Sequence, residues 1–503
     1  MSYNEKSYFY NKGRATKMSH PKDIPDINTQ YIDKPVGTQD IENPLIDIAK
    51  RFVDFCERFA TPFRSKTHSR KPQMQQYVSG LVQSDKKKNM ERMAEVVPDS
   101  DAQVFQQFLS DSEWDEREVF DLVATEANKS LGDPIDSCLI IDESGILKKG
   151  KKSVGGSKQW CGQIGKVENC QVGVFAALCH GNYVSLTDVR LFLPEESWIN
   201  DEERCLAAGV PVENIVVKRK QDLALEMVKH ARELGLEYKW VGCDGFYGED
   251  PAFLRALDTL PVPEIFMADV HKDQRVYLED PKPIVPPPKP GKRGKKPTRL
   301  QAQTKPIRVD EWASQQSVYA WKRMTLRDST KGELQVDILH ELVWLWDGFE
   351  AEAHYWHLVV RREVNAPSKL KYSLSNADNE TPVSRLAFMQ GQRYWVEHAL
   401  RNGKQEVGLG DYQVRGFCYW HHHMALVMMA MLFMLSGQML HQEDRPLLSY
   451  SDIRILLAHF LPRRDTTFDE VLRQMEHRHR QRQSSTDSAY KKQRTQQFDV
   501  LNE

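Results

Sequence analysis

The feature that most constrains the fold is an alternation of strand-like and helix-like segments between residues 136 and 270. The short apolar run at 138–141 predicts a buried strand. Two strand-like runs follow, and Gly181 and Asn182 between them are typical of a hairpin turn. The segments after the first are strands at 169–180 and 182–193, a helix at 223–234, a strand at 238–243, a helix at 251–257 and a strand at 264–270. This order predicts an α/β fold built on a mixed sheet.

The rest of the chain divides around this segment. Apolar residues recur at spacings of three and four between residues 45 and 59, which predicts a helical domain over 41–130 that we interpret as DNA-binding. Residues 1–40 are polar with scattered prolines and predict a flexible arm. We expect a first part of the core at 131–280, a basic proline-rich linker and β insertion at 281–375, and a last part of the core at 376–440. A C-terminal helical region at 441–503 would follow, with a disordered tail from His477.

Composition excludes several classes of protein. The 503 residues carry 69 Lys and Arg against 71 Asp and Glu, so the net charge of −2 gives no global sign of a nucleic-acid partner. The longest apolar run, 424–435, is too short to span a membrane and predicts a buried helix. The N-terminus lacks the apolar segment of a signal peptide, and the eight cysteines form no CxxC pair, which favours the cytoplasm. The adjacent histidines 421–423 would point in different directions on a helix, so we expect surface or structural rather than metal-binding roles.

Two aspartates follow predicted buried strands. Asp142 comes directly after the run at 138–141, and Asp244 comes directly after the strand at 238–243. A carboxylate at the end of a buried strand must be solvated, paired or metal-bound. Two such groups on neighbouring strands could hold a pair of Mg²⁺ ions about 3.5–4 Å apart, an arrangement suited to attack on a phosphodiester. The alternative is a pair of ordinary turn aspartates.

A third group of charged residues lies late in the chain, on a predicted helix that starts near residue 383. At 100° per residue, Glu397 lies about 40° and Lys404 about 20° from Arg393, so the three side chains form one narrow stripe. Such a stripe is often a solvated surface of ion pairs. The functional alternative is a metal-binding carboxylate flanked by two phosphate-binding cations.

These residues resemble a known family. The spacing R-(3)-E-(6)-K resembles the Y-(2)-R-(3)-E-(6)-K signature of bacterial insertion-sequence transposases in the DDE superfamily, whose core is ribonuclease-H-like. The strand and helix order of the core fits that fold as well. Three ordered blocks between residues 135 and 440 support the resemblance: IDESG at 141–145 with QIGKVENCQ at 163–171, DGFYG at 244–248, and KQEVGLGDYQVR at 404–415 followed by WHHH at 420–423.

The resemblance implies roles for particular residues. Asp142, Asp244 and Glu397 would be the catalytic triad and would bind Mg²⁺, for which Mn²⁺ would substitute. Arg393 and Lys404 would contact DNA phosphates. The family's tyrosine falls at Gln390, which can hydrogen-bond a phosphate but offers no aromatic ring. A β domain inserted between the second and third acids is also what the family implies.

Local basic segments offer further DNA contacts. Residues 281–308 contain eight prolines, nine Lys or Arg and no acid, so this segment could follow a phosphate backbone or simply serve as a solubilising linker. Lys148 lies just after the first acidic block and could contact DNA or belong to a charged turn. The predicted DNA-binding residues in these segments are Lys148, Lys292, Arg293, Lys295 and Lys296.

The resemblance implies a transposase that binds transposon ends in double-stranded DNA, cleaves them and joins their 3′-OH groups to target DNA, either directly or through hairpin ends. A homodimer would pair the two ends, in the bacterial cytoplasm at the nucleoid and without a membrane. Two alternatives remain open: a catalytically retired DNA-binding protein, and a metal-dependent nuclease that does not join strands.

Overall fold

The computed structural model describes residues 47–65, 68–85, 87–287, 297–329 and 332–501. The predicted flexible arm at 1–40 and the predicted DNA-binding residues Lys292, Arg293, Lys295 and Lys296 lie outside the described residues. The first described helix begins at Ile48.

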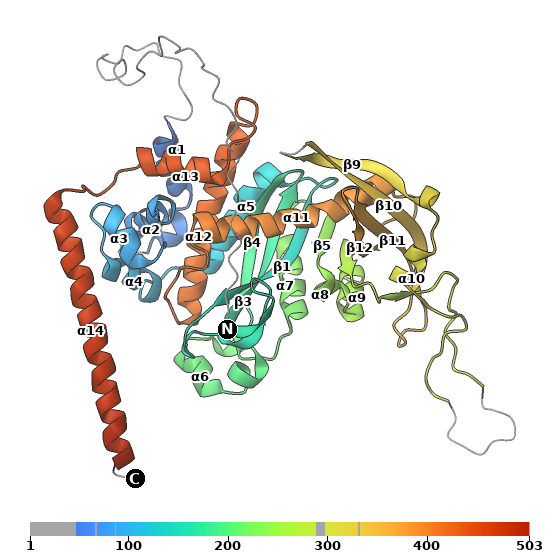
Figure 1. The fold of residues 1–503 in the computed structure, drawn as a ribbon, viewed down its shortest axis with the longest axis horizontal. Coiled ribbons are helices and arrows are strands. Elements are labelled where there is room, and N and C mark those ends of the chain that lie inside the picture. Colours follow the sequence, from blue (N-terminus) through green and yellow to red (C-terminus); the bar gives the residue numbers. More distant parts are fainter. Residues whose placement is uncertain (1–46, 66–67, 86, 288–296, 330–331, 502–503) are drawn as a thin grey trace, which may run out of the picture. The chain divides into compact units, whose positions relative to one another are not determined.

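A ten-stranded mixed sheet forms the centre of the fold (Figure 1). Its strands run in the order β2-β3-β1-β5-β6-β12-β11-β10-β9, with β4 also paired to β3. The strands are β1 Cys138–Leu147, β2 Ser157–Cys161, β3 Lys166–His180, β4 Tyr183–Leu191, β5 Trp240–Cys243, β6 Ile265–Val270, β9 Lys322–Ser329, β10 Gly332–Leu345, β11 His354–Glu363 and β12 Ala366–Ser375. β1, β5 and β6 are parallel, and the other pairings are antiparallel. The predicted α/β fold with a mixed sheet is confirmed.

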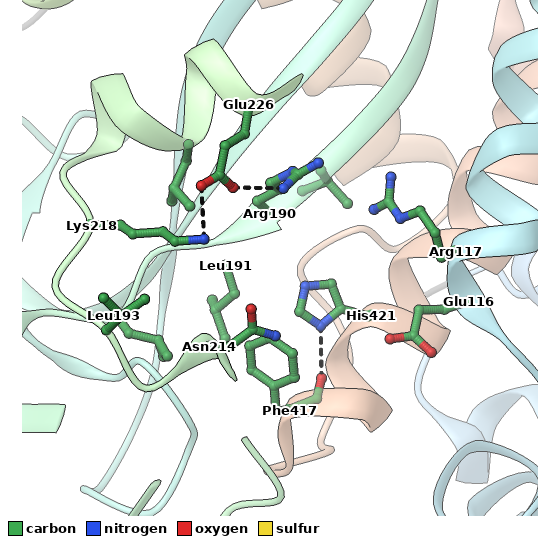
Figure 2. A pocket seen from close by; sticks show the side chains of 13 residues that line it. Glu116, Arg117, Arg190, Leu191, Leu193, Asn214, Lys218, Glu226, Phe417 and His421 are labelled. Atoms are coloured by element: carbon green, nitrogen blue, oxygen red, sulfur yellow. Dashed lines mark hydrogen bonds and ion pairs between the residues drawn. The ribbon is translucent and has the colours of Figure 1, made fainter. Parts of the chain in front are cut away.

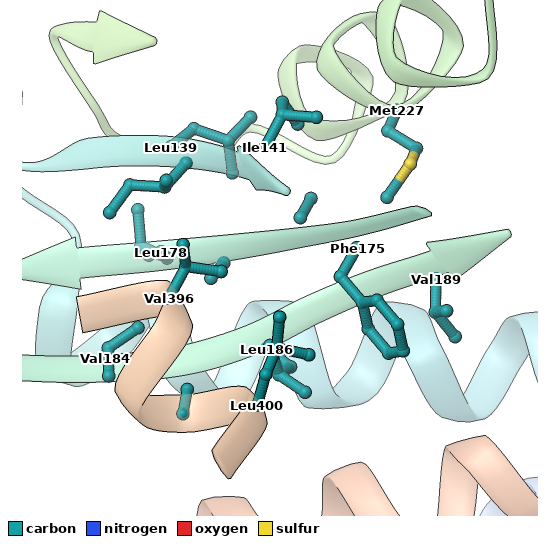
Figure 3. Packing of buried hydrophobic residues seen from close by; sticks show 14 of the residues in the cluster. Leu139, Ile141, Phe175, Leu178, Val184, Leu186, Val189, Met227, Val396 and Leu400 are labelled. Atoms are coloured by element: carbon teal, nitrogen blue, oxygen red, sulfur yellow. The ribbon is translucent and has the colours of Figure 1, made fainter. Parts of the chain in front are cut away.

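Helices cover both faces of this sheet. α11 Val383–Glu406 lies across one face and contacts β1, β5 and β6, whereas α7 Lys220–Glu233 packs on the other face (Figure 1). Figure 3 shows Val396 and Leu400 of α11 turned toward the sheet, and Met227 of α7 beside Ile141 on the opposite side. Burial of these apolar side chains fixes the distance of α11 from the sheet, so the charged side chains of α11 are held beside the strand ends.

The N-terminal helices share one hydrophobic core with the sheet. They are α1 Ile48–Arg58, α2 Lys71–Gln83, α3 Met90–Val96, α4 Ala102–Ser110 and α5 Glu116–Leu131. The apolar helix α12 Phe417–Leu440 packs against α2, α4 and α5 as well as β4. The ring of Phe433 lies 5.3 Å from the rings of both Phe52 and Phe55. These helices are therefore packed onto the core rather than separate from it.

Among the described residues, α12 is the one helix long and apolar enough to cross a membrane, and most of it is buried inside the protein. Its three adjacent histidines are buried, and each donates a hydrogen bond to a different backbone carbonyl: His421 to Phe417, His422 to Leu109 and His423 to Gly408. Of the two roles expected, surface or structural, these buried and divergent contacts fit the structural one.

The β insertion continues the core sheet. β12 pairs with β6, so β9 to β12 extend the sheet instead of forming a separate one. A small two-stranded sheet, β7 Arg275–Val276 with β8 Ile307–Arg308, and the short helix α10 Val309–Ser314 precede β9. The remaining helices are α6 Glu202–Ala207, α8 Gly245–Gly248, α9 Pro251–Asp258, α13 Tyr450–Phe460 and α14 Phe468–Leu501.

The predicted disordered tail is wrong in secondary structure, because residues from His477 onward continue the long helix α14. Polar Gln, Arg and Lys residues have high helix propensity even without an apolar face. The start of α14 is stabilised by an ion pair within the helix, Arg473 with Glu470 at 2.7 Å, and is anchored to α3 by Arg478, which pairs with Glu95 at 2.6 Å. Low hydrophobicity alone did not reveal these ion pairs.

The contact between α2 and α12 contains a buried hydrogen bond. Tyr77 is 1% exposed, and its hydroxyl lies 2.9 Å from His423 Nδ1. We expect Tyr77→Phe to lower the free energy of unfolding by about 1–3 kcal/mol, because it leaves a buried nitrogen without its partner. Urea denaturation measures this change. The exposed Tyr490 of α14 provides the control, and an equal loss in Tyr490→Phe would contradict a specific role for the buried bond.

Candidate active site

Three carboxylates form a row across the parallel strands. The ladder pairs Ile141 of β1 with Cys243 of β5, and Cys243 with Ala268 of β6. Matched residues of neighbouring strands point to the same face of a sheet. The next residue of each chain segment is an aspartate, and these are Asp142, Asp244 and Asp269. The structure thus places the two predicted aspartates side by side and adds Asp269, which the sequence analysis did not single out.

Burial sets the charge state of this row. Asp142 is 8% exposed, and burial, followed by the charge of Asp244, raises the pKa of Asp142 to about 7. Burial also raises the pKa of Asp244. Two neighbouring carboxyl groups with raised pKa values indicate an excess of negative charge that a cation would relieve.

Local geometry holds Asp244 in place. Its side chain caps α8, accepting a hydrogen bond from the backbone N–H of Phe246 at 3.1 Å. α8 in turn lies directly against β6, because a Cβ atom on Gly248 would sit 2.0 Å from the carbonyl oxygen of Asp269. The last glycine of the DGFYG block therefore permits the close approach of two segments that both carry acids of the row.

Arg393 joins the row to the helix. Its Nε lies 2.8 Å from Asp269 Oδ2, and its Nη2 lies 2.8 Å from Glu397 Oε1. Burial alone would lower the pKa of Arg393, but the charges of Asp269, Glu397, Asp142 and Asp244 outweigh burial and raise it. The structure therefore gathers the three predicted catalytic acids around one guanidinium. Glu397 is exposed on α11, so its carboxylate is free to exchange partners.

The donor set of these acids fits a hard divalent cation. Asp142, Asp244 and Glu397 offer only carboxylate oxygens, which Mg²⁺ and Mn²⁺ prefer. Among the described residues, the group whose ligand atoms already lie within 4.8 Å of one another is a different one: Glu249, His271 and Asp273. All three are exposed, and His271 already pairs with Glu249. We therefore place the candidate metal centre at the buried row.

A cavity of about 820 Å³ opens beside Asp244, Asp269 and Arg393, and the exposed side chain of Trp160 lines it as well. A different cavity, of about 190 Å³, lies between β4, α7 and α12 (Figure 2). There Glu226 bridges Arg190 and Lys218 at 2.8 Å each, and none of the three predicted catalytic acids takes part in the lining. The larger cavity is therefore the candidate substrate site.

Comparison with known proteins agrees with this geometry. A family described as DDE superfamily endonuclease matches residues 58–333, which include both Asp142 and Asp244. The chain belongs to the DDE superfamily of endonucleases. It is also 26% identical over 337 residues to a protein of Microchaete diplosiphon named "Probable transposase for insertion sequence element IS701", covering 67% of this chain and 74% of that relative. The resemblance to this superfamily that the sequence motifs predicted is confirmed.

Membership of this superfamily shows that the general activity of the chain is cleavage of DNA. Cleavage of DNA implies that DNA binds the chain, and enzymes of this superfamily generally use a divalent metal ion.

Lys404, two turns beyond Glu397 on α11, is half-buried and extends Nζ toward the backbone oxygen of Gly145 in β1 at 3.5 Å. Burial lowers the pKa of this lysine. Lys404 of α11 thus contacts the strand that carries Asp142, at a residue three positions further along β1.

Lys148, another predicted DNA contact, packs against an aromatic ring. Lys148 follows β1, and its Nζ lies 3.3 Å from the ring centre of Tyr412 and donates to that residue's backbone oxygen at 3.2 Å. Burial lowers the pKa of Lys148 to about 7.

The DNA contact predicted for Gln390 is not supported by the structure. This side chain is 3% exposed and donates hydrogen bonds to Val359 in β11 and Ser373 in β12. The stripe of charged residues on α11 begins at Arg393, because the turn before it is covered by the insertion.

The buried carboxylate row predicts a pH-dependent stability in the absence of divalent metal. Asp142 has a raised pKa in the folded chain, so the folded state binds more protons than the unfolded state between about pH 4 and pH 7. Stability is therefore lost as pH rises through this range. Asp142→Asn removes this loss, and we expect the variant to gain roughly 1–3 kcal/mol over the wild type at pH 8 and less at pH 5. Urea denaturation with EDTA measures this difference. A constant gain at both pH values would contradict the account.

Gly248 provides a steric test of the site. We expect Gly248→Ala to cost about 1–3 kcal/mol of stability, because the added methyl group collides with the backbone of Asp269. DNA cleavage should fall with it, since α8 positions Asp244. Gly162→Ala is the control, because a Cβ atom there meets no other atom within 4 Å. Equal thermal midpoints for the two variants would show that the close approach is not required.

Proposed function

We propose that this DDE endonuclease is a DNA transposase that binds transposon ends, cleaves them and joins the resulting 3′-OH groups to target DNA. The observation that carries this proposal is the convergence of Asp142, Asp244 and Glu397 around Arg393 beside an open cavity. The name of the Microchaete relative, a probable transposase, supports the same reading.

In this proposal the three carboxylates would hold two Mg²⁺ ions, or Mn²⁺ in their place. Bound there, the ions would supply the activation of the attacking oxygen and the stabilisation of the leaving oxygen. Arg393 would release its carboxylates and turn its guanidinium toward a phosphate, for which its planar donor set is suited. Lys404 would hold a neighbouring phosphate. No nucleophilic side chain is required for direct attack by water or a 3′-OH.

Further DNA contacts are proposed at Lys148. A cavity of about 650 Å³ is lined by Lys148, Lys149 and Arg415 and by no acidic residue. Lys148 lies six residues beyond Asp142, a separation of about 20 Å along an extended strand, so this cavity could hold the backbone of DNA that reaches the carboxylates. The basic segment around Lys292, Arg293, Lys295 and Lys296 remains a proposed DNA contact from its composition.

Other parts of the proposal follow from the resemblance to insertion-sequence transposases. A homodimer would pair two transposon ends, and the protein would act in the bacterial cytoplasm at the nucleoid. Hairpin ends and cut-and-paste transposition belong to the same proposal. The competing function is a metal-dependent nuclease that cleaves without joining strands, or a retired enzyme that only binds DNA.

Replacing Glu397 tests the site. We expect Glu397→Gln to reduce metal-dependent cleavage of transposon-end DNA by about 100-fold or more, because one carboxylate ligand is lost, while DNA binding persists. Glu352→Gln, at an exposed position in the insertion, is the matched control and should cleave like the wild type. Cleavage by Glu397→Gln at the wild-type rate would refute the assignment.

A strand-transfer assay separates the competing functions. The wild type should join a pre-cleaved end with a free 3′-OH to a plasmid when Mg²⁺ is present. Cleavage without joining would favour a nuclease, and binding without either reaction would favour a retired enzyme.

A further inference from the structure

Two like charges face each other in the insertion, next to the active site. The ladder between β11 and β12 pairs Arg361 directly with Lys371. Like charges in directly opposed positions destabilise a sheet. The pair therefore lowers the stability of the free protein unless a negative charge lies between the two side chains.

No such negative charge comes from the described part of the chain: no carboxylate there forms an ion pair within 4.0 Å of Arg361 or Lys371. The nearby carboxylate of Asp269 is occupied, since it binds Arg393 at 2.8 Å and accepts a hydrogen bond from Ser373 Oγ at 2.6 Å. Arg361 is only 9% exposed, so water solvates its charge poorly.

Neighbouring charges of both signs act on the pair. Burial lowers the pKa of Arg361, and Arg393 and Arg327 act in the same direction, whereas Asp269 and Glu363 oppose them. Burial, Arg361 and Arg393 lower the pKa of Lys371, against Asp269 and Glu397. Arg361, Lys371 and Arg393 thus form a cluster of positive charge that nearby acids offset without an ion pair to Arg361 or Lys371.

The position of Arg361 and Lys371 places this positive charge next to the candidate catalytic acids. Lys371 lines the same cavity as Asp244, Asp269 and Arg393. Arg361 lies beneath α11, where its Nη1 would be 3.7 Å from a Cβ atom on Gly391. An anion bound between Arg361 and Lys371 would therefore lie one strand away from the carboxylate row, because β12 pairs with β6.

We propose that Arg361 and Lys371 form a binding site for a backbone phosphate of duplex DNA beside the bond that is cleaved. This inference rests on the proposed function, which brings DNA into the cavity. A phosphate between the two cations converts their repulsion into two attractions, and a desolvated guanidinium is a strong donor to phosphate oxygens. The insertion thus supplies positive charge to a cavity that Asp244 and Asp269 also line.

The test measures DNA affinity as a function of salt. The full-length chain is titrated, in EDTA, with a fluorescent duplex of about 30 base pairs at several KCl concentrations between about 50 and 300 mM. We expect Lys371→Gln to reduce the slope of log K against log[KCl] by about 0.9, the value for one lost phosphate contact. Lys371→Arg should restore the wild-type slope. Lys239→Gln, an exposed lysine at the opposite end of β5 from Asp244, should leave the slope unchanged.

A second readout excludes a purely structural role. Because Lys371→Gln removes one of two opposed like charges, its thermal midpoint without DNA should equal or exceed that of the wild type. A lower midpoint, or a slope equal to that of Lys239→Gln, would overturn the proposal. Absence of duplex binding by the wild type would overturn both this site and the proposed function. A reduced slope in Lys371→Gln, combined with a wild type that does not join strands, would support the phosphate site and refute only the transposase.

Discussion

The candidate active site of this DDE endonuclease depends on the charge of Arg393. Three aspartates stand in one row across β1, β5 and β6, and Glu397 of α11 joins them. Without a counter-charge these carboxylates would repel one another and push α11 away from the sheet. The guanidinium binds Asp269 and Glu397 directly and lies close enough to Asp142 and Asp244 for their charges to raise its pKa. The apolar contacts of Val396 and Leu400 hold α11 against the sheet. Arg393 reduces the repulsion between the carboxylates that this position brings together.

Charge is distributed unevenly around this centre. The net charge of −2 averages an acidic row with clusters of cationic side chains elsewhere in the chain. Lys371, paired with Arg361 across β11 and β12, lines the candidate substrate cavity, and Lys148, Lys149 and Arg415 line another cavity beyond the end of β1. A polyanion that crosses the acidic row can therefore contact positive charge on both sides. The overall composition hid this pattern because positive and negative regions cancel in the sum.

Much of the fold and the site could be predicted from the sequence because the decisive signals are local. The short apolar run before Asp142 predicts a buried strand, and helical spacing places Arg393, Glu397 and Lys404 on one stripe. The strand was predicted to end at Asp142, but β1 continues to Leu147 because its pairing with β3 extends that far. Asp269 was missed because its role depends on strand register, which no local pattern encodes. The burial of Gln390 depends on packing of β11 and β12 over α11, a contact between segments distant in sequence. The helical tail was missed because its anchors, such as Glu95, lie far away along the chain.

The most direct test of the account is anomalous diffraction from crystals of the protein with Mn²⁺ and duplex DNA. The account predicts Mn²⁺ bound by Asp142, Asp244 and Glu397, with Arg393 moved from Glu397 toward a phosphate. Mn²⁺ bound only by the exposed group Glu249, His271 and Asp273, with the ion pairs of Arg393 unchanged, would contradict it.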